Sequence, residues 1–415
     1  MSLLLSQKVI KETIQELLEA GIIEPSTGPW SVPVVVVFKE GKSPRLCCDY
    51  RPLNKITKKN AYPIQRIDNI LDHLGPSKFF TTLDAKSGYH QIPVHPDDQD
   101  KTTFTTFFGT YKWTGMPFGI CNAPSKYQEE MDKLFWDILW TFVLNYIDDT
   151  VVYSVTFEDH LKHLEEVFRQ FRSINIKLHY KKCFFGFDHV DLLGHHISAE
   201  GTSTQPATIE RILSYPTPTT VKGVQSFLGL AGWYRNFVRD YSKISKPLNR
   251  LTRKENPFEW TPECEEAFQK LKTMLSSPPI LARPNFNKGF ILHTDASTVG
   301  LGAILAQKDE KGKERVIYYA SKGLIPAEEN YTATELELLA VVWAIKKFHH
   351  YLEGMHFDLY TDYSALRGLL KTASLKDYSG RINRWVLTLQ GMHYTIHHRP
   401  GRQHQHVDAL SRLGY

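Results

Sequence analysis

The chain has 415 residues, 42% of them hydrophobic and 12% aromatic, so we expect several packed domains and exclude a disordered chain. Fifty Lys and Arg oppose 45 Asp and Glu, and the resulting net charge of +5 is too small to indicate a nucleic-acid partner by itself. The five cysteines fit neither a disulfide framework nor zinc spacing, which favours a reducing intracellular setting, and the absence of a signal peptide or an apolar run of transmembrane length predicts no membrane partner.

The N-terminal segment predicts a helix followed by a basic hairpin. Apolar residues recur at helical spacing over residues 9–20, and Gly21 closes that helix. Residues 32–38 and 45–51 alternate as two strands around a Gly-containing turn, with Lys39 and Arg45 beside the turn. These cations either remain solvated or grip phosphate groups, and the hairpin alone favours the solvated alternative.

A single acidic residue ends the next predicted strand. Residues 79–84 form a strand that terminates at Asp84, just before a glycine-containing turn. A second hairpin is predicted over 103–113 with its turn at Gly109, and a helix over 124–139.

The segment 142–153 predicts a β-hairpin with two adjacent aspartates at its tip. Asp148 and Asp149 lie between apolar, β-branched runs, where neighbouring carboxylates repel each other and burial disfavours their charged forms. A surface turn would also accommodate them, because Asp is a good turn former. Asp84 precedes Asp148 by 64 residues, enough for a crossover to an adjacent strand, so the three carboxylates are expected to meet and bind metal.

Positive charge is concentrated in residues 206–255. Three acidic residues there oppose nine basic ones, which are Arg211, Lys222, Arg235, Arg239, Lys243, Lys246, Arg250, Arg253 and Lys254. Glycines and aromatic residues interleave with them in a helical pattern, which suits either a solvated helix face or a surface that tracks a duplex backbone. Prolines at 278, 279 and 284 then indicate a domain boundary.

A second set of carboxylates follows this boundary. Strands are predicted over 289–295, 300–307, 315–319 and 356–361, a long helix over 328–351, and a short helix over 407–412. Acidic residues end two of the strands or lie in the helices, namely Asp295, Glu335, Glu337, Asp362 and Asp408. The helical period does not separate Glu335 from Glu337, because that helix is apolar on most faces.

Other functions for this region have weaker support. Thr294-Asp295-Ala296 is not the Asp-Thr/Ser-Gly of an aspartic protease, and Gly300-Leu301-Gly302 lacks the third glycine of a dinucleotide loop. Histidines at 393, 397, 398, 404 and 406 have irregular spacing and no nearby cysteine, which argues against a structural zinc site.

Four motifs, in their order and spacing, closely resemble the reverse transcriptase of gypsy-type LTR retrotransposons (Metaviridae). They are Leu83-Asp84-Ala85-Lys86-Ser87-Gly88-Tyr89-His90-Gln91-Ile92, Gly115-Met116-Pro117-Phe118-Gly119-Ile120-Cys121-Asn122-Ala123-Pro124, Tyr146-Ile147-Asp148-Asp149 and Leu193-Gly194-His195-His196-Ile197-Ser198. The acids after the boundary resemble the Asp-Glu-Asp-Asp set of ribonuclease H, and the family pattern of Glu before Leu-Leu-Ala-Val selects Glu337.

The resemblance implies an α+β multidomain chain, a right-hand polymerase followed by an α/β ribonuclease H-like domain. Fingers are expected at 1–59 and 92–122, and the palm at 60–91 and 123–200. The basic segment becomes a thumb or connection at 201–283, and the ribonuclease H domain occupies 284–415. We also expect the chain to be one unit of a longer polyprotein.

By resemblance, the polymerase site holds two Mg²⁺ ions on Asp84, Asp148 and Asp149, and Mn²⁺ can substitute. The family's remaining contacts map onto Lys39 and Arg45 for the triphosphate of a dNTP, Tyr89 as the gate against a ribose 2′-OH, Phe118 beside the nucleotide, and Leu193 and Gly194 as primer grip.

The nuclease site is expected to hold two Mg²⁺ ions on Asp295, Glu337, Asp362 and Asp408 and to cut RNA in an RNA–DNA hybrid. Near the C-terminus His404 and Val407 depart from the family pattern, which puts an auxiliary role of His398 in doubt. Expected partners are the hybrid, an RNA template, a DNA primer and dNTPs, with a monomer or a homodimer as the active form.

Two alternative functions predict features that the sequence does not have. A catalytically silent nucleic-acid-binding subunit would be favoured by the loss of any of the seven carboxylates, and none is lost. A right-handed RNA polymerase predicts no ribonuclease H module and no bulky gate at Tyr89. The resemblance also implies an intracellular location, in cytoplasmic virus-like particles with a nuclear phase.

Overall fold

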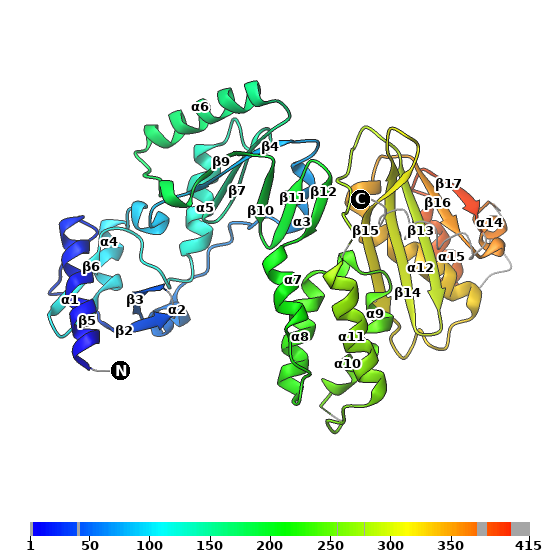
Figure 1. Ribbon diagram of the computed structural model, residues 1–415, viewed down its shortest axis with the longest axis horizontal. Helices are drawn as coiled ribbons and strands as arrows, with labels where there is room; N and C mark the ends of the chain where they lie inside the picture. Colours follow the sequence, from blue (N-terminus) through cyan, green and yellow to red (C-terminus); the bar gives the residue numbers. More distant parts are fainter. Residues whose placement is uncertain (1–2, 40–41, 255, 278, 372–379, 400–415) are drawn as a thin grey trace. The chain divides into compact units, whose positions relative to one another are not determined.

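The computed structural model describes residues 3–39, 42–254, 256–277, 279–371 and 380–399 (Figure 1). The chain forms two compact units, one of Met1–His73 with Ser77–Val190 and one of Leu74–Pro76 with Asp191–Tyr415. None of the helices in the described ranges combines the length and the apolar composition that a bilayer crossing requires.

The first unit combines helices of 4 to 17 residues with two mainly antiparallel sheets. Its helices are α1 (Leu3–Glu19), α2 (Arg51–Ile56), α3 (Ile67–His73), α4 (Pro96–Gln99), α5 (Ala123–Leu134) and α6 (Phe157–Ser173). One sheet has the order β1-β6-β5-β2-β3, with β1 (Ile23–Pro25), β2 (Val32–Lys39), β3 (Lys42–Cys48), β5 (Phe104–Thr106) and β6 (Gly109–Trp113). The other has the order β7-β8-β4-β9, with β4 (Phe79–Asp84), β7 (Val143–Tyr146), β8 (Asp149–Ser154) and β9 (Phe184–Phe187).

The three hairpins predicted in this unit are confirmed, and two predicted boundaries are wrong. The strand predicted over 45–51 ends at Cys48, because Pro52 pre-sets helical geometry and Arg51 already begins α2. The helix predicted over 124–139 ends at Leu134. Phe135 is fully buried after it, and Trp140 adopts a φ of 66° that turns the chain toward β7.

The second unit contains a helical segment and a mixed sheet with its own helices. Before the mixed sheet come β10 (His189–Leu192), which spans the unit boundary, β11 (His195–Ser198), β12 (Gly201–Thr204), α7 (Pro206–Leu213), α8 (Val221–Trp233), α9 (Tyr241–Ile244), α10 (Lys246–Leu251) and α11 (Pro262–Ser276). The mixed sheet has the order β15-β14-β13-β16-β17, with β13 (Phe290–Ser297), β14 (Gly300–Lys308), β15 (Glu314–Gly323), β16 (Phe357–Thr361) and β17 (Tyr394–His398). Its helices are α12 (Ala333–Lys347), α13 (His349–Leu352), α14 (Ser364–Lys371) and α15 (Gly380–Leu389).

Strand β14 is buried on both faces, which explains its uninterrupted apolar sequence. Successive side chains of a strand point to opposite faces. Ala303 and Leu305 therefore enter the core formed with α12 and α15, whereas Ile304 enters the core formed with the helices of the segment 206–276. The sheet is thus covered by helices on both sides within this unit.

The four strands predicted in this sheet are confirmed, but the helix predicted over 328–351 begins too early. Glu328 instead accepts a hydrogen bond from the Ile325 amide and pairs with Lys322, and Thr332 caps the first turn of α12. Elements α14, α15 and β17 were not predicted. The helix predicted over 407–412 lies outside the described residues.

The four-part division into fingers, palm, thumb and ribonuclease H domain stays a prediction. Residues of α8, α10 and α11 share one hydrophobic core with Val316 and Tyr319 of β15. The proline-rich boundary near residue 283 therefore separates two sequence regions that belong to the same compact unit.

Candidate active sites

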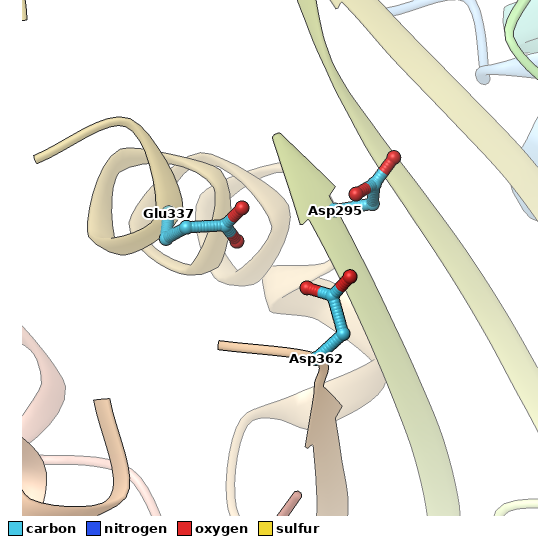
Figure 2. Close-up of side chains that lie close together, drawn as sticks. All are labelled: Asp295, Glu337 and Asp362. Atoms are coloured by element: carbon cyan, nitrogen blue, oxygen red, sulfur yellow. The ribbon is translucent and has the colours of Figure 1, made fainter. Parts of the chain in front are cut away.

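Three of the acidic residues predicted for the nuclease site lie together in the second unit (Figure 2). Asp295 belongs to β13, Asp362 directly follows β16, and Glu337 projects from the first turns of α12. Strands β13 and β16 are parallel neighbours, so their carboxyl ends meet at one edge of the sheet. Each of the three side chains offers a carboxylate oxygen within 4.8 Å of the other two.

The structure separates the two glutamates that the sequence pattern left unresolved. Glu335 occupies the N3 position of a capping box with Thr332, and its carboxylate also pairs with Arg381 at 3.2 Å. Glu337, two residues later, points to the opposite side of the helix and is buried beside Asp295 and Asp362. Glu335 is therefore a helix-capping residue, and Glu337 is the glutamate of the carboxylate cluster.

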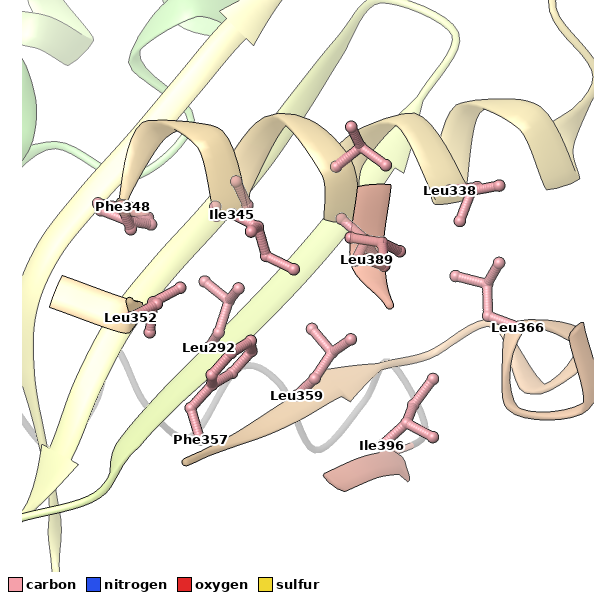
Figure 3. Close-up of a cluster of buried hydrophobic side chains, with 14 of the residues drawn as sticks. Leu292, Leu338, Ile345, Phe348, Leu352, Phe357, Leu359, Leu366, Leu389 and Ile396 are labelled. Carbon is pink, nitrogen blue, oxygen red and sulfur yellow. The ribbon is translucent and has the colours of Figure 1, made fainter. Parts of the chain in front are cut away.

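A hydrophobic core fixes the helix that carries Glu337 (Figure 3). Leu338 and Ile345 of α12, and Phe348 directly after this helix, pack against Leu292 of β13 and Leu359 of β16, and the exposed fraction of each is 3% or less. Because protein interiors are close-packed, such a core leaves α12 little freedom to slide along the sheet. The spacing of the three carboxylates is therefore set by the fold.

The environment of the cluster favours a cation. Burial, together with the Asp362 and Asp295 charges, raises the pKa of Glu337 to about 8, and burial raises the pKa of Asp295 as well. Oε2 of Glu337 is buried and has no hydrogen-bond partner among the described residues. Hard divalent cations prefer such carboxylate oxygens, so these residues fit a divalent-metal site.

The raised pKa predicts a pH-dependent stability of the metal-free protein. Native Glu337 holds its proton up to about pH 8, whereas the unfolded chain releases it near the ordinary value of 4.5. The contribution of Glu337 to the free energy of unfolding should therefore be largest below pH 4.5. Between pH 4.5 and about pH 8 this contribution should fall with rising pH, by at most about 1.4 kcal/mol per pH unit.

Urea unfolding in EDTA at several pH values would measure this slope. The Glu337→Gln variant should lack the contribution, because an amide does not titrate. A wild-type slope equal to that of Glu337→Gln would contradict the raised pKa.

Asp408, which is expected to bind metal, and His398, whose auxiliary role is in doubt, are the other residues named for the nuclease site. Asp408 lies outside the described residues. His398 lies on β17 beside β16, and its Nε2 donates a hydrogen bond to the backbone carbonyl of Asp362 over 3.0 Å. This histidine is therefore held at the edge of the cluster.

The first unit brings the three predicted polymerase aspartates onto adjacent strands. Asp84 at the end of β4 is the direct cross-strand partner of Asp149 at the start of β8, and Asp148 lies in the turn between β7 and β8. Their oxygens do not meet the 4.8 Å spacing of the nuclease cluster, which is the one such group in the described ranges. Lys182 approaches Asp84 instead, with its Nζ 3.5 Å from Oδ2.

The turn that carries Asp148 is strained and is held by a residue that we did not predict. Ile147 has a φ of 54°, a conformation that is rare for a β-branched residue. Its amide donates to Oε1 of Gln128 over 2.7 Å, and Nε2 of Gln128 donates to the carbonyl of Asn145 and to Asp132. No local pattern identifies Gln128, because this role arises only when α5 packs on the hairpin.

Electrostatics at this tip resemble those of the nuclease cluster. Loss of hydration raises the pKa of Asp148, and the charges of Asp149 and Asp84 raise it further. The pKa of Asp149 is raised by the same loss of hydration and by Asp84. Clustered carboxylates that resist ionisation favour a divalent cation as their counter-ion.

Tyr89 and Phe118 form an aromatic wall near these aspartates. The Tyr89 ring lies 5.1 Å from that of Phe118 and 5.3 Å from that of Tyr127, between ring centroids. Burial, with a contribution from the Asp148 charge, raises the pKa of Tyr89 to about 12. Gly115 allows its own backbone to lie against the backbone of His90, because a Cβ at position 115 would lie 2.1 Å from the His90 carbonyl oxygen.

The predicted triphosphate-binding residues lie on the β2–β3 hairpin. Arg45 of β3 is exposed, whereas the side chain of Lys39, the last residue of β2, lies outside the described part of the chain.

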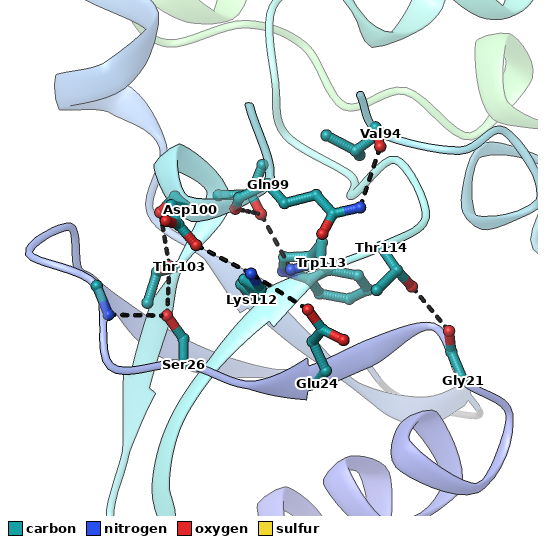
Figure 4. A network of polar contacts seen from close by, with 12 residues as sticks. Gly21, Glu24, Ser26, Val94, Gln99, Asp100, Thr103, Lys112, Trp113 and Thr114 are labelled. Carbon is teal, nitrogen blue, oxygen red and sulfur yellow. Dashed lines mark hydrogen bonds and ion pairs between the residues drawn. The ribbon is translucent and has the colours of Figure 1, made fainter. Parts of the chain in front are cut away.

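A polar network stabilises the opposite edge of the sheet that includes this hairpin, at β1 and β6 (Figure 4). Lys112 pairs with Glu24 and Asp100 at 3.2 and 3.1 Å, and Thr114 donates to the Gly21 carbonyl.

The predicted primer-grip residues form the tight turn between β10 and β11. Leu193 and Gly194 have φ values of 50° and 81°, and the Tyr234 hydroxyl donates to the Gly194 carbonyl over 2.5 Å. The turn is therefore anchored to the end of α8, within the second unit.

Two protein-family models match two separate stretches of the chain. Residues 37–197 match the family described as reverse transcriptase (RNA-dependent DNA polymerase), and this stretch includes Asp84, Asp148 and Asp149. Residues 260–359 match the RNase H-like domain found in reverse transcriptase, which includes Asp295 and Glu337.

Relatives of the chain are polyproteins of transposable elements. The retrovirus-related Pol polyprotein from transposon 297 of Drosophila melanogaster is 38% identical over 411 residues, covering 97% of this chain and 38% of the polyprotein. The corresponding polyprotein from transposon gypsy of the same organism is 35% identical over 422 residues, covering 97% of this chain and 40% of the polyprotein. The chain thus spans about two fifths of these relatives.

Solved structures agree with this relationship. The foamy viral protease-reverse transcriptase dRH in complex with double-stranded DNA superposes with a TM-score of 0.86 at 27% identity, covering 95% of this chain and 69% of that chain. The foamy viral protease-reverse transcriptase in complex with an RNA/DNA hybrid gives a TM-score of 0.77 at 26% identity, covering 95% and 54%. The expected α+β multidomain architecture of polymerase and nuclease is confirmed. The chain belongs to the reverse transcriptases with an RNase H-like domain that are found in the Pol polyproteins of LTR retrotransposons.

Proposed function

We propose that the chain synthesises DNA on RNA and DNA templates and cleaves the RNA strand of RNA–DNA hybrids. One observation carries the proposal: carboxylates come together at two separate places. In the reverse transcriptase domain they lie at the ends of adjacent strands, and in the RNase H-like domain they lie at two strand ends and on helix α12. A catalytically silent subunit is not favoured, because six of the seven acidic residues lie in these two arrangements and Asp408 is retained in the sequence.

In the polymerase domain, Asp84, Asp148 and Asp149 would bind the divalent ions that the incoming dNTP and the primer 3′-hydroxyl require. Arg45 would bind the triphosphate in a bidentate manner, with Lys39 as a second positive charge. Tyr89 would exclude a ribose 2′-OH, with Phe118 beside the nucleotide. The Leu193-Gly194 turn would hold the primer end.

In the nuclease domain, Asp295, Glu337, Asp362 and Asp408 would bind metal at the scissile phosphate of the RNA strand. When bound at either site, two Mg²⁺ ions, or Mn²⁺ in their place, activate the attacking oxygen and stabilise the leaving oxygen. Contacts to 2′-OH groups and phosphates would select the hybrid largely without regard to sequence. The excess of positive charge in residues 206–255 supports phosphate contacts along the duplex.

The four-domain division, the assembly and the cellular setting are further parts of the proposal. The two sheets of the first unit support the fingers and palm segments, because β1, β2, β3, β5 and β6 fall within 1–59 and 92–122, and β4, β7, β8 and β9 fall within 60–91 and 123–200. A homodimer, in which one copy serves structurally, is proposed beside the monomer. Membership of the retrotransposon family supports work in cytoplasmic virus-like particles with a nuclear phase.

The test combines two assays on the same preparation. Primer extension on an RNA template with dNTPs, and cleavage of labelled RNA in a hybrid, should both require Mg²⁺ and stop in EDTA. Synthesis that prefers rNTPs would contradict the reverse transcriptase proposal. A chain that binds the hybrid but performs neither reaction would support the silent subunit instead.

Replacing Tyr89 by Ala should relax the selection of deoxynucleotides. Removing the ring opens the space that a 2′-OH would occupy, and discrimination of this kind is worth roughly 1–3 kcal/mol, or about 10- to 200-fold. The ratio of kcat/KM for dNTP over rNTP should fall by this factor, measured by single-nucleotide primer extension. Tyr89→Phe keeps the ring and should retain the wild-type ratio. An unchanged ratio in Tyr89→Ala would remove Tyr89 from this role.

A further inference from the structure

A short stretch of the helical segment forms one wall of the nuclease site. Ser242 at the start of α9 donates its backbone N–H to Oγ of Ser321 on β15 over 2.9 Å. Asp240 lies just before α9 and has a φ of 56°. Its carboxylate packs against Gly302 of β14, because a Cβ added to Gly302 would lie 3.4 Å from Oδ1 of Asp240. Asp240 therefore lines the same cavity, of about 160 Å³, as Asp295 and Asp362.

Lys243 on α9 reaches from this wall to the carboxylate cluster. Its Nζ lies 3.5 Å from Oδ2 of Asp295 and 3.6 Å from Oδ1 of Asp240, so one ammonium group bridges the two carboxylates. Only a quarter of the Lys243 side chain is exposed. The interaction is thus partly protected from solvent, where exposed ion pairs lose most of their strength.

We propose that Lys243 is the resident counter-ion of the nuclease carboxylates, that a divalent ion must displace it from Asp295, and that Asp240 holds it when displaced. This inference rests on the nuclease function proposed above. A divalent ion would bind the same Asp295 carboxylate, and two cations on one carboxylate repel each other.

The chemistry of the side chain suits this role. Lysine carries a compact charge on a flexible four-carbon stem, so its ammonium group can move between carboxylates a few ångströms apart. Asp240 already lies within 3.6 Å, and Lys243 can leave Asp295 without becoming an unpaired buried charge. The metal affinity of the nuclease site is therefore set partly by a residue outside its own sheet.

Direct measurement of Mn²⁺ binding tests the proposal without relying on turnover. The full chain carrying Asp148→Asn and Asp149→Asn serves as the reference, because binding at the polymerase aspartates is then suppressed. Free Mn²⁺ is followed by electron paramagnetic resonance during titration. In this background Lys243→Gln should bind Mn²⁺ about tenfold more tightly, because the competing charge is gone.

Asp240→Asn gives a prediction of the opposite sign. Without Asp240 the ammonium group remains on Asp295, so Mn²⁺ should bind several-fold more weakly. In the double variant Lys243→Gln/Asp240→Asn this weakening should disappear, because it acts through Lys243. An Asp240→Asn effect of equal size in both backgrounds would show a general charge effect and would overturn the role of Asp240.

Two controls separate the possible failures. Lys311→Gln removes one charge from the exposed turn at the far end of the β14–β15 hairpin and should leave Mn²⁺ affinity unchanged. Asp362→Asn should abolish binding at the nuclease site, and retained binding there would overturn the proposed nuclease site itself. Binding that is lost in Asp362→Asn but is unchanged in Lys243→Gln would overturn the displacement of Lys243 alone.

Discussion

Replacing Asp148 by Asn is expected to reduce DNA synthesis by about a thousandfold, because a metal ligand contributes several kcal/mol to the stabilisation of the transition state. Asp148 lies at the tip of the β7–β8 hairpin, and Asn has nearly its shape without its charge. The loss should therefore arise from metal binding and not from misfolding. Primer extension on an RNA template, with excess dNTPs and Mg²⁺, measures it.

Hybrid cleavage provides the internal control for this variant. Asp148 belongs to the first unit, whereas the nuclease cluster belongs to the second, so RNA cleavage by Asp148→Asn should proceed at the wild-type rate. Asp137→Asn, which neutralises an exposed aspartate in the turn after α5, should leave both activities intact. Normal primer extension by Asp148→Asn would refute the assignment of the polymerase site.

Glu337→Gln should produce the reverse pattern, with hybrid cleavage reduced about a thousandfold for the same reason and DNA synthesis unchanged. The carboxylate of Glu337 lies within 4.8 Å of those of Asp295 and Asp362, and its Oε2 is buried without a hydrogen-bond partner in the described ranges. A neutral amide at position 337 would remove one negatively charged metal ligand from the cluster of Asp295, Glu337 and Asp362. Cleavage of end-labelled RNA in a hybrid, under single-turnover conditions, is the measurement.

The neighbouring glutamate supplies a matched control on the same helix. Glu335→Gln keeps a side chain that can complete the capping box with Thr332 and loses only its ion pair with Arg381. Cleavage by this variant should stay near the wild-type rate. If Glu335→Gln were the inactive variant and Glu337→Gln the active one, the roles assigned to the two residues would be wrong.

Local sequence patterns predicted the elements that carry the carboxylates. The hairpin around Asp148 and Asp149 and the strands ending near Asp84, Asp295 and Asp362 follow from alternation and from turn residues. The choice of Glu337 over Glu335 required the family pattern, because α12 is apolar on most faces. Its physical reason, a capping box that engages Glu335, became visible only in three dimensions.

Residues that act across elements could not be predicted in this way. Gln128 supports the Asp148 turn from α5, and Lys243 reaches Asp295 from a helix some fifty positions earlier in the chain. Neither forms a local motif, since each role depends on how distant segments pack. The same holds for α14, α15 and β17, whose short apolar runs do not distinguish helix from strand.

The double burial of strand β14 has a consequence for moving the RNase H-like domain into another chain. Ile304, Val316 and Tyr319 belong to a core completed by the helices before residue 277, so the RNase H fold here has no finished solvent-facing surface on that side. If only the region after Pro284 were moved, the apolar side chains on this face of the sheet would be exposed to solvent. Exposed apolar patches of this kind promote self-association. We therefore expect the sheet β15-β14-β13-β16-β17 to stay folded and monomeric only when it is transferred together with the helices that precede it.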